Sequence, residues 1–232
     1  MSILVVGSMA LDSIKTACEE KTECLGGSAT FFSISASYFS PVNIVAVVGE
    51  DFPEKYLSFL KKRKDIDISG IEVKKGKTFR WKASYECDIN NPQTLETHLN
   101  VFGQFKPAIS SKYRKSKYLF LANIDPDLQD SILNQIPRPK IVACDSMNYW
   151  IDTKKASLES LLKKVDIFFA NDAEARKLAQ EDNILKAARH ILKLGPKIAV
   201  IKKGEHGVLF CSAKSSFIAP ARFKTEYKIG AA

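Results

Sequence analysis

The sequence has 232 residues, of which 45% are hydrophobic and 26% are charged, a composition typical of a soluble protein with a sizeable core. Its 35 basic and 26 acidic residues give a formal charge of +9, which favours anionic partners such as nucleotides, phosphorylated metabolites or nucleic acid. No apolar run reaches membrane-spanning length and the first residues lack a basic region, which argues against a membrane or secreted protein and predicts a cytoplasmic location.

The cysteines are few and scattered along the chain. No Cys-x-x-Cys pair is present, so we expect a reducing compartment and no structural zinc site. We predict a single α/β domain over residues 1–232.

The chain opens with a short apolar run at residues 3–6 that predicts a buried strand ending at Gly7. Asp12 follows soon after. A carboxylate beyond the carboxyl end of a strand lies where α/β sheets usually bind ligands, although a turn or helix cap would use the same residue type.

The Gly26-Gly27 pair then precedes a helix expected over residues 29–39, which ends before Pro41. Residues 43–48 predict a second buried strand. A Gly-Gly turn at the start of a helix leaves backbone N–H groups free and lets a ligand approach the main chain. A tight turn before a core helix is the simpler interpretation of the pair taken alone.

Residues 52–62 have helical spacing, and residues 66–73 predict a short link. The alternation changes to period two over residues 77–102, which predicts a β-hairpin with a turn near residues 88–92. We interpret the segment of about 71–105 as a lid on the main sheet. Its alternating apolar face also favours a homodimer formed through the lid.

A strand–helix rhythm resumes at residue 118 and favours a doubly wound, mostly parallel sheet with helices on both faces. The expected strands are 118–122, 140–144, 165–170, 197–201, 208–211 and 216–218, and the expected helices are 127–135, 154–163, 173–180 and 183–194. Polar residues follow several strands, namely Asp12, Asn123, Asp145, Asn171 and the turn at 203–207. Each could cap a helix, but together they predict one ligand crevice.

Four segments in this order resemble the ribokinase-like (PfkB) family of carbohydrate and nucleoside kinases. They are GSMALDS with Asp12, LGGSATFFSISASYFSPVNIVAVVGEDF, FANDAEARKL with Asn171 and Glu174, and VIKKGEHGVLF with Gly204 and Gly207. The resemblance covers nearly the whole chain, and the inserted hairpin sits where the family carries its substrate lid.

The resemblance implies transfer of the γ-phosphoryl group of ATP to a hydroxyl of a sugar or nucleoside. It implies substrate binding by Asp12, Gly26, Gly27, Asn123 and Asp145. It implies that Asn171 and Glu174 organise Mg²⁺ and the phosphates, and that Lys203, Gly204 and Gly207 line the nucleotide. Such a reaction depends mostly on positioning and charge neutralisation.

The sequence departs from the family at its end. Family members carry a Gly-Ala-Gly-Asp motif whose amides form an anion hole and whose Asp is the general base. Here the sequence Gly230-Ala231-Ala232 falls where that motif should begin, so we expect no catalytic base within these residues and place it beyond Ala232.

Three functions stay open. The first is an ATP-dependent kinase present here as an incomplete chain that is inactive alone. The second is a degenerate protein that binds a sugar or nucleotide without turnover. A basic nucleic-acid-binding domain has least support, because no aromatic–basic interleaving accompanies the charge, so we expect a small-molecule partner and neither nucleic acid nor membrane.

Overall fold

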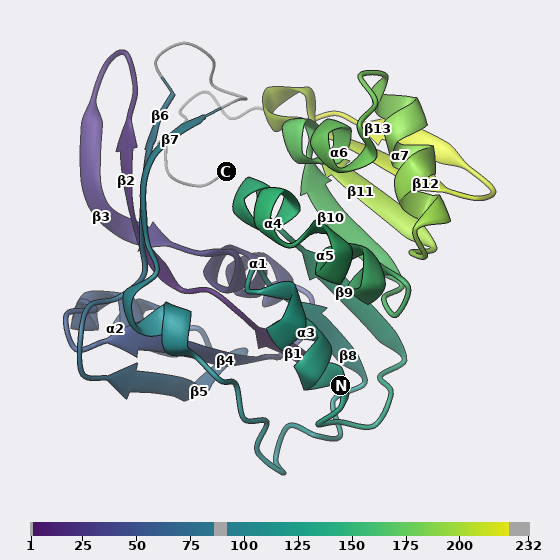
Figure 1. Cartoon of the computed structure of the whole chain (residues 1–232). Helices are drawn as coiled ribbons and strands as arrows, with labels where there is room; N and C mark the ends of the chain where they lie inside the picture. The colour runs from purple at the N-terminus through teal and green to yellow at the C-terminus, as the bar shows by residue number, and fades with distance from the viewer. Residues whose placement is uncertain (1, 86–91, 223–232) are drawn as a thin grey trace. The chain divides into compact units, whose positions relative to one another are not determined.

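The structure is a computed structural model that describes residues 2–85 and 92–222. The chain forms two compact units, one from residues 1–123 and 132–140 and the other from residues 124–131 and 141–232. Helix α3, Pro126–Leu133, contributes residues to both. Each unit has its own strands and helices (Figure 1).

The first unit contains four parallel strands in the order β8-β1-β4-β5. They are β1 Ile3–Val6, β4 Val42–Gly49, β5 Ile66–Lys74 and β8 Tyr118–Leu121. The sequence of β4, VNIVAVVG, is almost entirely buried, as expected for a parallel strand covered on both faces. Helices α1 Ser28–Ala36 and α2 Glu54–Lys61 contact β4 and β5, respectively. The prediction of a short link at residues 66–73 was wrong, because these residues form the edge strand β5.

The same unit contains a second sheet, in the order β3-β2-β6-β7 (Figure 1). Its strands are β2 Ala10–Lys15, β3 Glu20–Gly26, β6 Arg80–Ser84 and β7 Gln93–His98. The predicted hairpin is present as the antiparallel pair β6–β7, but residues 100–104 form the 3-10 helix η1 Asn100–Gln104 instead of extending its second strand. The turn predicted at residues 88–92 falls almost entirely outside the described residues.

The sequence did not predict β2 and β3 as a hairpin that joins this sheet. Strand β3, EKTECLG, is exposed over its first four residues and carries no apolar alternation, so it lacks the usual signal of a strand. The region interpreted as a lid is therefore part of a four-stranded sheet to which residues 10–26 contribute half of the strands.

The second unit contains five strands in the order β13-β12-β11-β10-β9. They are β9 Ile141–Asp145, β10 Ile167–Asn171, β11 Ile198–Lys202, β12 Val208–Ser212 and β13 Ser216–Ala219. Strands β9, β10 and β11 are parallel, and β12 and β13 continue the sheet in antiparallel fashion. The predicted mostly parallel α/β organisation is confirmed.

The helices of the second unit lie close to the predicted positions. They are α4 Asn148–Thr153, α5 Lys155–Leu162, α6 Asp172–Ala179 and α7 Ile184–Lys193, with the 3-10 turn η2 Gly204–His206. The short helix α4 was not predicted as an element. Across residues 2–85 and 92–222, no helix combines the length and the apolarity needed to cross a bilayer.

Candidate active site

The loop after β1 is anchored by Ser8, which is fully buried. Its Oγ accepts a hydrogen bond from the Ser28 N–H at 3.2 Å, and its carbonyl accepts one from the Ala29 N–H at 3.0 Å. The Ser8 N–H donates to the Asn123 carbonyl at 3.2 Å. Ser8 thus accepts hydrogen bonds from two of the first N–H groups of α1 and connects the start of this helix to Asn123, which follows β8. These two N–H groups are therefore already hydrogen-bonded within the protein.

Asp12 lies within strand β2 and not in a loop beyond β1, which corrects the position expected from the sequence. It is opposite Cys24 in the antiparallel pair of β2 and β3. A Cβ at Gly26 would lie 2.0 Å from Asp12 Oδ2, so only glycine at this position lets the carboxylate pack against β3. Asp12 and the Gly-Gly stretch, which the sequence analysis assigned to one site, therefore lie in direct contact.

Gly27 adopts a φ of 93°, and a Cβ there would lie 2.5 Å from the Ser8 carbonyl oxygen. Its N–H donates a hydrogen bond to the Asp12 carboxylate. Burial raises the pKa of Asp12 to about 7, and this hydrogen bond offsets only part of that rise. Burial also raises the pKa of Tyr85, and the negative charge of Asp12 adds to the effect.

A polar network that the sequence did not reveal connects the end of β4 to the second sheet of the same unit. The Thr78 N–H and Oγ1 both donate to Asp51 Oδ1 at 2.7 Å, and Arg80 bonds Asp51 Oδ2 at 2.7 Å and Glu23 Oε1 at 2.8 Å. Burial raises the pKa of Asp51, but hydrogen bonds from Thr78 and Arg80 outweigh it and lower the pKa overall. The position of Asp51 just after a predicted strand was the only hint in the sequence.

In the second unit, Asn171 and Glu174 form a capping box at the start of α6. The Asn171 Oδ1 accepts from the Glu174 N–H at 2.7 Å, and the Glu174 Oε2 accepts from the Asn171 N–H at 2.7 Å. One oxygen of each side chain is therefore occupied by the helix cap. Within the described chain, the capping box uses Glu174 Oε2, and no hydrogen bond is made to Oε1.

Glu174 is 9% exposed, and burial raises the pKa of its carboxyl group. The positive charge of Lys202 and the hydrogen bond from the Asn171 N–H act in the opposite direction. Lys202 lies beside Asn171 in the register of β11 and β10. The sequence did not single out Lys202, although it directly precedes the predicted Lys203.

The turn after β11 brings Lys203, Gly204 and Gly207 together. The Lys203 N–H donates to the Gly207 carbonyl at 2.8 Å, and the Lys203 Nζ lies 3.7 Å from an oxygen of Asp172. A Cβ at Gly207, whose φ is 84°, would lie 2.0 Å from the Ala219 carbonyl oxygen. Gly207 is thus required by the packing of the turn against the end of β13 and the residues that follow it.

Asp145 is the last residue of β9 and is 9% exposed. Its carbonyl accepts a hydrogen bond from Gln129 Nε2 at 3.1 Å, and it is opposite Phe169 on β10, two residues before Asn171. The carboxyl ends of the parallel strands β9, β10 and β11 therefore carry three of the predicted polar positions along one edge of the sheet: Asp145, Asn171 and the turn at 203–207. The sequence 230–232, where the family motif was expected to begin, lies outside the described residues.

The second unit offers a partial set of groups for a divalent cation. Over residues 2–85 and 92–222, no cluster of three or more His, Cys, Asp or Glu side chains could hold a metal. Glu174 presents a buried carboxylate whose ionised form a cation would stabilise. Mg²⁺ commonly takes one or two carboxylates and completes its shell with water and substrate phosphates, so these residues fit a cation that arrives with a nucleotide.

The model of the pfkB family of carbohydrate kinases matches residues 3–227. The chain belongs to this family. A curated relative, the cytidine kinase of Thermococcus kodakarensis, is 26% identical over 213 residues, which span 90% of this chain and 75% of the relative.

Solved structures share the fold. The nucleoside kinase of Methanocaldococcus jannaschii, an archaeal member of the ribokinase family, has a TM-score of 0.70 and 17% identity, over 94% of this chain and 76% of its own. A ribokinase of Cryptococcus neoformans in complex with ADP has a TM-score of 0.75 and 15% identity, over 97% and 80% of the two chains. A putative ribokinase II of E. coli in complex with ATP and Mg²⁺ has a TM-score of 0.74 and 16% identity, over the same shares of 97% and 80%. The predicted ribokinase-like fold is confirmed.

Proposed function

We propose that this pfkB-family chain binds a nucleoside or sugar and ATP for transfer of the γ-phosphoryl group to a substrate hydroxyl. The observation that carries the proposal is the carboxylate of Asp12, held by the Gly26-Gly27 backbone at the start of α1 within the family match over residues 3–227. Similarity to a cytidine kinase and a nucleoside kinase favours a nucleoside as the acceptor.

On the acceptor side, Asp12 would accept a hydrogen bond from a substrate hydroxyl. The Gly27 N–H already donates to the carboxylate, so the glycine pair acts chiefly by positioning Asp12 and by leaving room beside it. Asn123, fixed through its carbonyl to the Ser8 N–H, and Asp145, at the end of β9, are the further polar candidates for contact with the substrate.

On the nucleotide side, Glu174 and Asn171 would hold the water shell of Mg²⁺, with Glu174 using the oxygen that the capping box leaves. A bound Mg²⁺ supplies charge neutralisation to the phosphates. Lys203 would contribute its cation, and Gly204 and Gly207 would shape the turn that lines the nucleotide. The ATP and ADP bound by solved relatives support this side of the proposal.

Residues 1–232 contain no Gly-Ala-Gly-Asp sequence, so we propose that they bind substrates and by themselves turn over little. The second candidate function is binding without catalysis. The nucleotide sequence after codon 232 distinguishes the kinase from the binding protein. A Gly-Ala-Gly-Asp motif encoded within a few codons favours the kinase, and its absence favours the binding protein.

Isothermal titration of cytidine, adenosine, ribose and fructose against residues 1–232 tests the acceptor site. We expect at least one to bind, with affinity reduced at least about tenfold in Asp12→Asn. Asp152→Asn is a matched control, because Asp152 is an exposed carboxylate that pairs with Lys177 on the surface. Equal binding by wild type and Asp12→Asn would overturn the assignment.

An assay of ADP formation with the same panel tests catalysis by residues 1–232. We expect negligible turnover. Robust turnover that disappears in Asp12→Asn would place the catalytic base inside these residues and would contradict the proposal of low turnover.

A further inference from the structure

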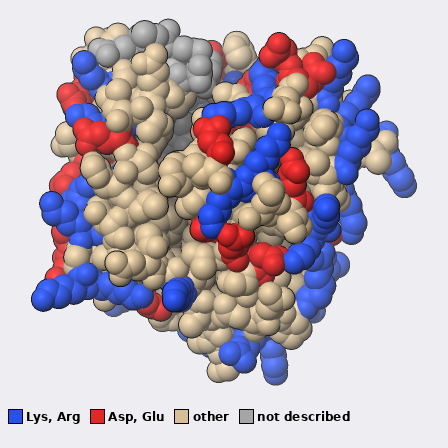
Figure 2. All heavy atoms as spheres, in the orientation of Figure 1, with Lys and Arg blue, Asp and Glu red and all other residues tan. Residues whose placement is uncertain are grey.

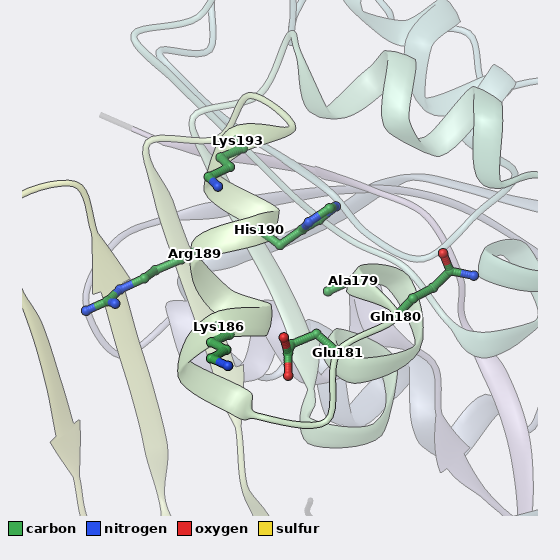
Figure 3. A pocket seen from close by; sticks show the side chains of 7 residues that line it. All are labelled: Ala179, Gln180, Glu181, Lys186, Arg189, His190 and Lys193. Carbon is green, nitrogen blue, oxygen red and sulfur yellow. The ribbon is translucent and has the colours of Figure 1, made fainter.

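A cavity of about 340 Å³ lies on the second unit between the end of α6 and the exposed face of α7 (Figure 3). It is lined by Ala179, Gln180, Glu181, Lys186, Arg189, His190 and Lys193. Its volume falls in the range that small-molecule sites occupy. The site proposed for phosphoryl transfer does not use any of these residues.

Four basic side chains share one face of α7 at positions i, i+3, i+4 and i+7: Lys186, Arg189, His190 and Lys193. The opposite face of the helix is buried through Ala187, Ala188 and Ile191. The buried face of α7 therefore orients the backbone so that all four basic side chains leave the helix on its solvent-exposed side, and Figure 3 shows Arg189 and His190 extending in different directions from it.

The neighbouring basic residues of this unit behave differently. Arg176 pairs with Asp172, Lys177 with Asp152 at 2.6 Å, and Lys197 with Asp166 at 2.8 Å. Within residues 2–85 and 92–222, the four basic residues of α7 have no ion pair. The basic groups that surround the cavity are thus among those left without an acidic partner in the described part of this unit.

Neighbouring like charges at these helical spacings destabilise a helix by a few tenths of a kcal/mol per pair. A bound dianion would remove that repulsion. Lys and Arg side chains gather at the upper right of the molecular surface, where Figure 1 places α7 (Figure 2). Glu181, whose Oε1 accepts from the Asn183 N–H at 2.9 Å, adds a fixed acceptor at the edge of the cavity.

We propose that this cavity binds the phosphate group of a small phosphorylated metabolite. The phosphate would lie among the basic groups of α7, namely Lys186, Arg189, His190 and Lys193. The Glu181 carboxylate would accept hydrogen bonds from hydroxyls of the attached group, and the Gln180 amide would donate or accept them. The cavity lies at the end of α6 opposite to Asn171 and Glu174, about 12 Å along an eight-residue helix. The inference therefore stands independently of the proposed kinase function.

Isothermal titration of inorganic phosphate and ribose 5-phosphate into residues 1–232 tests the site, with ribose as the uncharged comparison. We expect ribose 5-phosphate to bind more tightly than phosphate, and Arg189→Gln with Lys193→Gln to weaken both at least about tenfold. Lys61→Gln with Lys62→Gln removes the same charge from exposed positions of the first unit and should leave binding unchanged. Circular dichroism of both double variants checks that they fold.

Four results would overturn the proposal. Equal binding by wild type and the α7 variant would exclude the cavity as the phosphate-binding site. An equal loss of affinity in both double variants would show that binding depends on the net charge of the protein and not on this cavity. Phosphate binding that is lost in Glu174→Gln but kept in the α7 variant would place the ligand at the nucleotide site. Binding of single-stranded RNA without binding of either small phosphate would instead make this face a polyanion surface.

Discussion

The carboxyl group of Asp12 links the folding of the first unit to pH. Its pKa is about 7 in the folded protein against an ordinary value of 3.8. Between these values the folded state binds more protons than the unfolded state, so the free energy of unfolding falls as the pH rises. The three-unit difference corresponds to at most about 4 kcal/mol.

Asp12→Asn should remove this pH dependence, because asparagine stays neutral. We expect the variant to match wild type near pH 3, below the ordinary pKa of 3.8, and to exceed it by about 1–4 kcal/mol at pH 8 in urea unfolding. Burial, and then the charge of Asp12, raises the pKa of Tyr85, so this side chain stays neutral over the same range. Parallel stability profiles for the two proteins would show that Asp12 titrates normally.

Gly27→Ala should destabilise the protein by about 1–3 kcal/mol, because the residue has a φ of 93° and the added Cβ would meet the Ser8 carbonyl oxygen at 2.5 Å. Gly103→Ala is the control. Its Cβ would meet only the Leu99 side chain, at 3.3 Å, and we expect a change within about 0.5 kcal/mol. Thermal and urea unfolding measure both, and similar values for the two variants would contradict the role assigned to Gly27.

At the scale of elements, two helices of the second unit begin with an asparagine cap. Asn171 caps α6 as part of the proposed nucleotide site, and Asn183 caps α7 by accepting from the Leu185 and Lys186 N–H groups at 3.1 Å. The two caps are chemically alike, so replacing each one separates a structural role from a binding role.

Asn171→Ala and Asn183→Ala should each lower the free energy of unfolding by about 1 kcal/mol. Only Asn171→Ala should also weaken binding of ATP with Mg²⁺, by about tenfold in isothermal titration, because its loss frees Glu174 from the capping box. If both variants bind ATP as wild type does, Asn171 is a helix cap and nothing more.

The elements that the sequence predicted correctly are those with strong apolar patterns. Strand β4 is a continuous apolar run, and α7 alternates buried and basic positions with helical spacing. Strands β2 and β3 escaped prediction because β3 is mostly polar and exposed, and because β2 is placed by its pairing with β6, a strand far away in the sequence. Long-range pairing of this kind leaves no periodic trace in a local stretch of sequence.

At the scale of the whole molecule, the sequence predicted the identity of residues that lie close together within a unit better than it predicted the elements that hold them there. Asp12 and the glycine pair meet as expected, but through a strand pair in place of a loop. The Asp51, Thr78 and Arg80 network joins residues almost 30 positions apart, and only the fold brings them together. Side-chain hydrogen bonds across separate elements depend on registers that the sequence does not specify.

The second sheet of the first unit also bears on assembly, and we propose that it forms the homodimer contact expected from the alternation of its hairpin. Strand β7 is the edge strand of this sheet among the described residues, and its Leu95 is 50% exposed. Leu95→Lys should convert a concentration-dependent dimer to a monomer in size-exclusion chromatography with light scattering. Ile218→Lys is the matched control, since Ile218 is 63% exposed on β13, the edge strand of the second unit, and should leave the dimer intact. A wild-type chain that stays monomeric at all concentrations, or a dimer lost only in the Ile218 variant, would refute this interface.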